Sequence, residues 1–364
     1  MIVSIIGVGL IGGSIGLALK EFSVHQVGSP VTKSSEVGVK KIIGIGRNLN
    51  RLKVAKKLGA VDEITTDIKE GVKDADIVFV CLPVGLIAKT VKNIIPFCKK
   101  GAIITDIGSV KAPIVSEVEK FLFPIPYPLS PAFIGGHPIA GSEKTSVKHS
   151  FAELFQHTVV VLTPTKKNTK KSLNMLKKIW QNMGAKVKIM KPAKHDEIIS
   201  FTSHLPHIVA FALVNSVDNL EFAGNGFKDT TRIASSAPEM WADIIFNNRT
   251  NVRQAIKKFK KELSKIENAK SQKELVKIFG KAKTKRDDLC DDRTLAEKTL
   301  IKFIEISRNQ RKISPSVREV AKYFKVSVST AHQHLKNLYN KGLLIRRKSQ
   351  NSSRMVARGI TNKK

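Results

Sequence analysis

The chain has 364 residues, of which 42% are hydrophobic, so it is long enough for two or three globular domains. Its three cysteines, Cys81, Cys98 and Cys290, have no paired spacing, which argues against a disulfide framework or a zinc site and favours a reducing cytoplasm. The formal net charge of +33 favours polyanionic partners such as nucleic acid or small anionic substrates, with a lysine-rich solubilising surface as the alternative.

The first predicted element is a strand at Ile2–Ile6, which runs into a Gly7-x-Gly9-x-x-Gly12 turn and an apolar helix through Leu19. This apolar start lacks a basic leader and is broken by glycines, so no signal peptide or membrane helix is predicted. Glycines at such a turn let the backbone approach a pyrophosphate, although they also serve simple helix packing. The predicted cofactor residues are Gly7, Gly9, Leu10, Ile11 and Gly12, with Leu82 and Pro83 after a later strand.

Strands alternate with helices along the first half of the chain, which predicts an α/β fold with a parallel, Rossmann-type sheet over residues 1–165. A polar insertion at 25–38 interrupts the pattern, and a proline-rich segment at 123–131 is predicted as a surface loop. The predicted strands are 41–46, 77–82, 102–106, 158–162 and 186–190, and the predicted helices are 49–58 and 170–183.

Cofactor choice depends on the end of the second strand, where an acidic residue would bind the ribose hydroxyls of NAD. The chain has Arg47 there, between Gly46 and Asn48, and an arginine suits the 2′-phosphate of NADP. NADP is therefore expected in preference to NAD. An ordinary surface arginine is the alternative, because the preceding insertion shifts the register.

Residues 166–285 are predicted as a mainly helical domain for substrate binding and dimerisation, which begins with a long helix at 193–219. The stretch Ile198–Val217 is apolar nearly all round, so it is buried either inside a helical domain or across a dimer interface. We expect a homodimer. A charged, poorly patterned segment at 286–293 is predicted as a linker.

Four short motifs lie downstream of the glycine turn: Asp106-Ile-Gly-Ser109-Val-Lys111, Gly136-His137-Pro-Ile-Ala-Gly141-Ser-Glu143, Ser203-His204-Leu-Pro206-His207 and Asp229-Thr-Thr-Arg232-Ile-Ala. Together with Trp241, they resemble the prephenate dehydrogenase family over roughly Ile2–Leu275. The resemblance implies a cytoplasmic enzyme on the route to tyrosine. It would oxidatively decarboxylate prephenate, or the related arogenate, with a nicotinamide cofactor.

That chemistry needs a base for a ring hydroxyl, cations for two carboxylates and an acceptor for hydride. His137, in a glycine-flanked loop, can take the hydroxyl proton, because histidine titrates near neutral pH. By resemblance, Ser109 hydrogen-bonds the same centre and orients His137. By the same resemblance, Arg232 binds a substrate carboxylate through paired N–H groups of its planar guanidinium.

His204 and His207 are three residues apart, which predicts that they share one helix face, and Pro206 predicts a local bend. The resemblance places this pair at the substrate. Without it, half of a metal site or two core histidines would be the alternatives. No metal is expected.

Two acidic residues are predicted near the substrate. Asp229 precedes Arg232 by three residues and either orients it or forms an ion pair that pins the helix. Glu143 resembles the family's gating or substrate-proximal acid, although a surface glutamate would look identical in the sequence.

The tail departs from the family pattern, and residues 294–364 are predicted as a winged helix-turn-helix. Helices at 295–307, 317–324 and 329–341 precede strands at 343–347 and 355–359, which flank a basic tip. The segment Ser314–Ile360 resembles the DNA-binding domain of LexA-type repressors. From Arg293 to Lys364 there are 18 Lys and Arg against three Glu, a net charge of +15.

This resemblance implies duplex DNA as a partner, with the third helix in the major groove and the wing on the backbone. The alternative is a protein-interaction module, since winged helices serve both uses. A transcriptional regulator that uses the dehydrogenase-like part as a metabolite or NADP sensor is the competing function. The predicted DNA-binding residues are Ser329, Thr330, His332, Gln333, Lys336, Arg346, Arg347 and Arg354.

Overall fold

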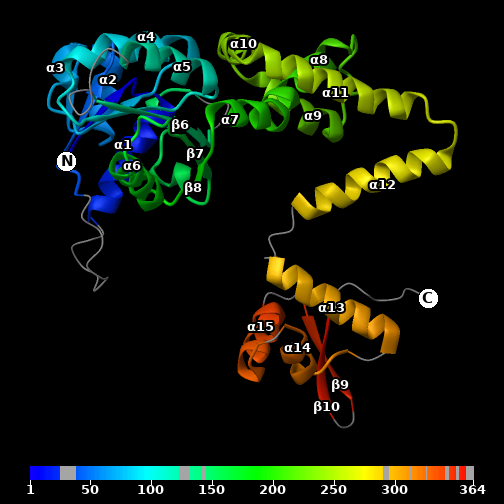
Figure 1. The fold of residues 1–364 in the computed structure, drawn as a ribbon. Helices are drawn as coiled ribbons and strands as arrows, with labels where there is room; N and C mark the ends of the chain where they lie inside the picture. The colour runs from blue at the N-terminus through cyan, green and yellow to red at the C-terminus, as the bar shows by residue number, and fades with distance from the viewer. Residues whose placement is uncertain are drawn as a thin grey trace. The chain divides into compact units, whose positions relative to one another are not determined.

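The computed structural model describes residues 1–24, 38–122, 131–141, 145–289, 295–311, 314–324, 326–340, 344–349 and 352–357 (Figure 1). They divide into two compact units, Met1–Leu263 and Ser264–Lys364, which are taken in turn. The predicted insertion at 25–38 and the proline-rich segment lie mostly outside the described residues.

The first unit is built on an eight-stranded sheet with the order β3-β2-β1-β4-β5-β6-β7-β8. Neighbouring strands are parallel except β6 and β7, which are antiparallel. The predicted Rossmann-type topology is confirmed, since β1 pairs with both β2 and β4. The strands are β1 (Ile2–Ile6), β2 (Lys41–Ile45), β3 (Glu63–Thr65), β4 (Ile77–Val80), β5 (Ile103–Asp106), β6 (Ala132–Ile139), β7 (Val159–Thr163) and β8 (Lys186–Ile189).

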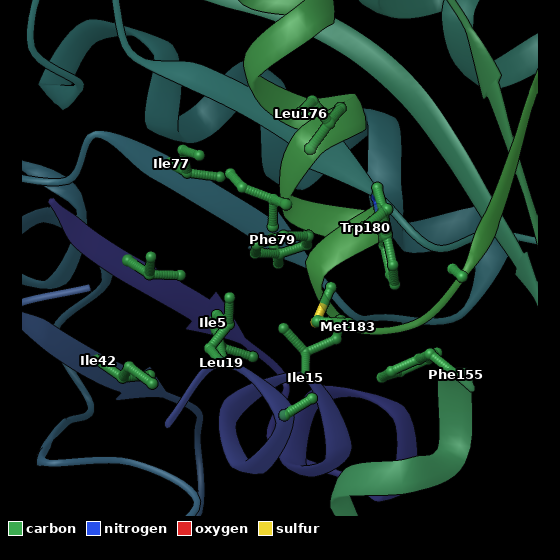
Figure 2. Packing of buried hydrophobic residues seen from close by; sticks show 14 of the residues in the cluster. Ile5, Ile15, Leu19, Ile42, Ile77, Phe79, Phe155, Leu176, Trp180 and Met183 are labelled. Atoms are coloured by element: carbon green, nitrogen blue, oxygen red, sulfur yellow. The ribbon is translucent and has the colours of Figure 1, made fainter. Parts of the chain in front are cut away.

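Helices cover both faces of this sheet, because successive strand residues point to opposite sides. In β4, Ile77 and Phe79 join the core on one face, while Val78 and Val80 join the core on the other. Apolar side chains from α1, α2 and α6 complete the first core, in which Trp180 stacks edge-on against Phe79 (Figure 2). Helices α3, α4 and α5 complete the second. The helices are α1 (Leu10–Val24), α2 (Leu49–Lys57), α3 (Ile68–Val72), α4 (Val84–Ile94), α5 (Ala112–Leu122) and α6 (Lys170–Asn182), with short turns η2 (Ile95–Phe97), η3 (Val147–His149) and η4 (Ala152–Phe155).

The segment that carries His137 is a strand, so the prediction of a glycine-flanked loop was wrong. His137 lies in β6, opposite Val161 of β7. The two preceding glycines serve close packing rather than a turn. A Cβ on Gly136 would lie 2.7 Å from the carbonyl oxygen of Asp106, and one on Gly135 would lie 2.5 Å from Oγ1 of Thr163.

The sheet continues beyond residue 165 to β8, and the chain then becomes helical. One continuous helical run, Pro192–Asn215, replaces the helix predicted at 193–219. Trp241 and Ile244 of α10 belong to the second sheet core, and α10 contacts α4, one of the helices that cover this face of the sheet. The elements are α7 (Pro192–Ile199), the π-helical turn η5 (Ser200–His204), α8 (Leu205–Asn215), α9 (Asn225–Thr231), the 3-10 turn η6 (Arg232–Ser235), α10 (Pro238–Asn247) and α11 (Arg249–Glu267).

Helix α8 is only partly covered by the described part of the chain, since Ala210 is its one buried residue and its larger apolar residues are of intermediate exposure. Complete burial inside a single chain, one of the two alternatives for this stretch, is therefore not observed among the described residues. By length and composition the run Pro192–Asn215 could cross a membrane, with a mean hydropathy of 1.4, but one such helix is weak support for a membrane span.

The second unit contains a three-helix and hairpin fold around a small core. Ala331, Leu335 and Leu338 of the third helix pack against Ile304 and Val320 of the other two. Helix α12 covers residues 286–289 of the predicted linker, and residues 290–293 lie outside the described part of the chain. The elements are α12 (Gln272–Leu289), α13 (Leu295–Arg311), α14 (Val317–Phe324), α15 (Val328–Asn340), β9 (Leu344–Ser349) and β10 (Ser352–Ala357).

Candidate active site

The glycine turn after β1 makes a tight bend against the neighbouring strands. Gly7 has φ of +90°, and a Cβ there would lie 2.3 Å from the carbonyl oxygen of Cys81. A Cβ on Gly12 would lie 2.4 Å from the carbonyl oxygen of Gly7. These two glycines are therefore required by the packing of the turn itself.

Gly9 differs, because a Cβ at this position would meet no described atom within 4 Å. Helix α1 begins at the next residue, Leu10, so its first amides, including that of Ile11, face the same end of the sheet. Open space beside a glycine and a helix N-terminus fits a dinucleotide pyrophosphate. The residues present therefore fit the predicted cofactor.

Arg47, Leu82 and Pro83 all lie beside this turn. The amide of Gly7 donates to the carbonyl of Ile45 at 2.8 Å, so the end of β2 and the exposed Arg47 adjoin the turn. A Cβ on Gly7 would lie 2.9 Å from Cδ2 of Leu82, and Pro83 caps the start of α4. The structure thus brings the sequence-predicted cofactor residues to one edge of the sheet.

His137 is 7% exposed, and the loop that carries Ser109 is tied to its strand. The carboxylate of Asp106 accepts from the amide of Gly136 at 3.1 Å and from the amide of Gly108 at 2.9 Å. The fully buried Lys111 ion-pairs with Asp106 and donates to the carbonyl of Gly136 at 2.8 Å. Ser109, half-buried in the middle of this loop, is therefore held next to the strand of His137.

One residue that the sequence motifs did not include, His195, contacts His137, and a second, Asp196, contacts His195. Its Nδ1 lies 2.8 Å from Nε2 of His195, and Nδ1 of His195 lies 2.7 Å from Oδ1 of Asp196. Both partners are on α7 and are buried. An adjacent His-Asp pair was the available signal in the sequence, but no motif or period connects it to His137, which is 58 residues away from His195.

Burial dominates the electrostatics of the histidines in this site. Desolvation lowers the pKa of His137 well below its ordinary value, and electrostatic interactions with neighbouring His195, Lys111 and His204 act in the same direction. Burial also lowers the pKa of His195, against the opposing effect of Asp196. At neutral pH both rings are therefore uncharged and can accept a proton.

His204 and His207 share a helix face, as predicted, and both contact Trp241. His207 stacks on the indole with ring centroids 3.4 Å apart, and His204 meets it edge-on at 6.1 Å. The predicted local bend is the π-helical turn Ser200–His204, just before Pro206, where the amide of Leu205 donates to the carbonyl of Ser200. Burial lowers the pKa of His204 to about 4.

The remaining substrate candidates lie on and after α9. Arg232 is exposed and close enough to His207 to lower its pKa electrostatically, although burial of His207 is the larger cause. Asp229 is exposed on α9, three residues before Arg232. Glu143 lies outside the described residues.

In the second unit, α15 exposes Thr330, His332, Gln333 and Lys336 on the face opposite its core residues. The hairpin register sets Arg347 of β9 opposite Arg354 of β10, with Arg346 next to it along β9. The side chains of Ser329, Arg346, Arg347 and Arg354 lie outside the described part of the unit.

A reciprocal cap between two side chains and two backbone amides stabilises the start of helix α14. The amide of Ser316 donates to the carboxylate of Glu319 at 2.6 Å, and the amide of Glu319 donates to the hydroxyl of Ser316 at 3.3 Å. Arg311 of α13 pairs with the same glutamate. These bonds lower the pKa of Glu319 to about 2, the backbone amide of Ser316 being the largest cause.

Family models match three consecutive parts of this chain. "Prephenate dehydrogenase, nucleotide-binding domain" matches residues 33–189, "prephenate dehydrogenase, dimerization domain" matches 191–281, and "LexA DNA binding domain" matches 291–354.

Individual relatives agree with the first two models. Prephenate dehydrogenase of Bacillus subtilis is 34% identical over 293 residues, which cover 77% of this chain and 73% of the relative. Cyclohexadienyl dehydrogenase of Zymomonas mobilis is 30% identical over 276 residues, or 73% of this chain and 87% of the relative. The crystal structure of prephenate dehydrogenase from Aquifex aeolicus, in complex with hydroxyphenyl propionate and NAD+, matches with a TM-score of 0.70 and 36% identity, covering 79% of this chain and 98% of the other.

Proposed function

The chain is a nicotinamide-dependent dehydrogenase that belongs to the prephenate dehydrogenase family, and we propose that it converts prephenate to 4-hydroxyphenylpyruvate and carbon dioxide on the way to tyrosine. The observation that carries the dehydrogenase activity is the buried His137 in contact with His195, in the same unit as the glycine turn. The competing regulator that only senses a metabolite is not favoured, because His137, Ser109 and Arg232 are all retained.

When bound at the glycine turn, a nicotinamide dinucleotide supplies the hydride acceptor. His137 takes the proton of the ring hydroxyl as the carbon that bears it is oxidised, and the ring then loses carbon dioxide and becomes aromatic. A base of this kind contributes about 10²–10⁴-fold to the rate. Ser109 hydrogen-bonds the same hydroxyl centre and orients His137.

The substrate is held through its two carboxylates. Arg232 binds one of them with paired N–H donors, which gives both affinity and orientation. His204 and His207, fixed against Trp241, line the substrate region. In this region, Asp229 orients Arg232. Glu143 gates the access of substrate to the site. The exposed position of Arg232 beside His207 supports this arrangement.

A panel of turnover assays tests this function. The purified protein is mixed with prephenate or arogenate and with NAD+ or NADP+, and reduced cofactor is followed by absorbance. We expect turnover with prephenate in at least one combination. If none of the four combinations produces reduced cofactor above a protein-free control, the enzyme assignment is wrong.

We further propose a cytoplasmic homodimer in which α8 packs against a second copy. The partly exposed apolar surface of α8 and the match of residues 191–281 to a dimerization-domain model support it. Sedimentation analysis should give twice the mass of the 40.2 kDa chain. A monomer at micromolar concentration would refute the dimer.

A second function, sequence-specific binding of duplex DNA, is proposed for the winged helix of the second unit. The match of residues 291–354 to the LexA DNA binding domain and the exposed polar face of α15 support this function. Thr330, His332, Gln333 and Lys336 would read the major groove together with Ser329, while the arginines of the hairpin would contact phosphates.

A further inference from the structure

A chain of three side chains runs from the buried interior of the first unit to His137. It begins at Asp196, passes through His195 and ends at Nδ1 of His137, with heavy-atom distances of 2.7 and 2.8 Å. Asp196 is 1% exposed and His195 is fully buried. In a buried series of hydrogen bonds such as this one, each donor must face an acceptor, so few positions are possible for each proton.

The carboxylate of Asp196 is held as an acceptor by the backbone. Its Oδ1 accepts from the amide of Lys111 at 2.7 Å, and its Oδ2 accepts from the amide of Ala112 at 2.8 Å. The side-chain amide of Asn248 also fixes the Asp196 carbonyl at 2.9 Å. An ionised carboxylate has no proton to give, so the bond to His195 requires the proton on Nδ1 of His195.

The position of that proton determines the next one. A neutral imidazole carries one proton, so when Nδ1 of His195 is the donor, its Nε2 is an acceptor. The 2.8 Å contact then requires a proton on Nδ1 of His137. The nitrogen left with a free lone pair is Nε2 of His137. Burial keeps both rings uncharged at neutral pH, as this sequence of donors and acceptors requires.

We propose that His195 and Asp196 are positioning residues that hold His137 in the tautomer with its proton on Nδ1, so that Nε2 is always ready to accept the substrate's hydroxyl proton. The hydroxyl proton moves to Nε2, which makes His137 an imidazolium, and the Asp196 carboxylate stabilises that charge through His195. The inference rests on the proposed role of His137 as the base. It adds two residues from α7 that orient the base from the side opposite its reactive nitrogen.

The direct test is the tautomer of His137 in the protein without substrate. Histidine-labelled (¹⁵N) full-length protein is examined by NMR, and the His137 ring signals are assigned from their loss in His137→Asn. We expect a protonated Nδ1 and an unprotonated Nε2. A protonated Nε2 would overturn the proposal, and this result does not depend on turnover or on the folding of any other variant.

Two substitutions of His195 test the catalytic consequence. His195→Phe keeps a ring but removes the hydrogen-bond acceptor. Because this change misorients the base and leaves the substrate-binding residues in place, kcat should fall about 10- to 100-fold while KM for substrate changes little. His195→Gln places an amide oxygen near the position of Nε2 and should restore most of the lost kcat. Equal loss in both variants, or wild-type kcat in His195→Phe, would contradict the proposal.

A matched control separates these effects from a general loss of structure. His334→Phe makes the same chemical change on the exposed surface of α15 and should leave kcat, KM and the melting temperature unchanged. If the wild-type protein turns over none of the tested substrates, the proposed function fails. The tautomer measurement still decides whether His195 and Asp196 orient His137.

Discussion

His137 combines two properties that rarely coincide, burial in the protein and readiness to accept a proton. Exposed histidines share their proton with water and adopt either tautomer. Here desolvation lowers the pKa, so the ring is uncharged at physiological pH, while the contact to His195 orders its nitrogens. The cost of burying the ring is a weaker basicity of His137.

Burial of His204 predicts a loss of stability in acid. Its folded-state pKa of about 4 lies below the ordinary histidine pKa of 6.5, so the unfolded chain takes up a proton first as the pH falls. The free energy of unfolding should therefore decrease between pH 6.5 and pH 4, by about 3 kcal/mol from this residue alone. Urea unfolding of the enzyme without substrate at several pH values measures it.

His204→Phe should flatten this dependence, although His137 and His195 keep part of it. The exposed His334 provides the control, and His334→Phe should retain the full slope. An identical slope in His204→Phe and the wild type would show that His204 does not stay uncharged in the folded state.

Arg47 tests the cofactor preference at a single side chain. The exposed guanidinium follows β2, next to the glycine turn, and would attract the 2′-phosphate of NADP. Arg47→Asp should shift the ratio of kcat/KM values towards NAD by roughly tenfold or more, or about 1.4 kcal/mol. An unchanged ratio would mean that Arg47 does not face the adenosine ribose.

At the scale of elements, Gly9 and Gly7 of the glycine turn have different roles, one in cofactor binding and the other in the packing of the turn. Gly9→Ala should weaken dinucleotide binding about ten- to thirty-fold, because the added methyl group occupies space that the pyrophosphate needs, and should leave the melting temperature nearly unchanged. Gly7→Ala should instead lower the melting temperature, since the position has φ of +90° and no room for a Cβ. Calorimetry and a fluorescence titration with the dinucleotide measure both effects. If Gly9→Ala binds the cofactor normally, the open space beside Gly9 is not the pyrophosphate site.

Strands with a strong apolar pattern were predictable from sequence, and those with special local packing were not. β4 is a continuous run of buried apolar residues, and β1 and β5 are also mostly buried, with polar residues at Ser4 and at Thr105 and Asp106. β3 has three residues, too few to show a period. β6 contains Gly135, Gly136 and Pro138, residues that normally mark a loop. Here the glycines are needed because a side chain at Gly136 would clash with the backbone of Asp106, which packs against the strand.

The candidate site shows the same division. Residues that lie in local motifs, such as His137 and His204, were found from sequence. His195 was missed because its contact with His137 joins α7 to β6 and depends on the tertiary packing of the helical part on the sheet.

At the scale of the whole molecule, the distribution of charge predicts how the protein binds DNA. Full-length protein should bind duplex DNA with an affinity that falls by about 10³–10⁵ over a roughly four-fold rise in salt, if about six to ten phosphates are contacted. A chain that ends near Asp292 should bind far more weakly, because it lacks the +15 carried by the tail.

The double variant Gln333→Ala with Lys336→Ala separates sequence reading from charge. It should abolish preference for a sequence selected from a random duplex library while retaining part of the non-specific affinity. A dimer would present two winged helices, so the selected site should be an inverted repeat. No enriched sequence, together with unchanged affinity after truncation, would identify the winged helix as a protein-interaction module.

The most direct test of the central claim is the product balance of the full-length enzyme with prephenate, measured for the wild type and for His137→Asn. The wild type should form reduced nicotinamide, 4-hydroxyphenylpyruvate and carbon dioxide in equal amounts. His137→Asn should bind the dinucleotide normally but form all three products about 10²–10⁴-fold more slowly, because its proton acceptor is missing. Reduced nicotinamide without carbon dioxide, or equal rates in the two proteins, would contradict the account.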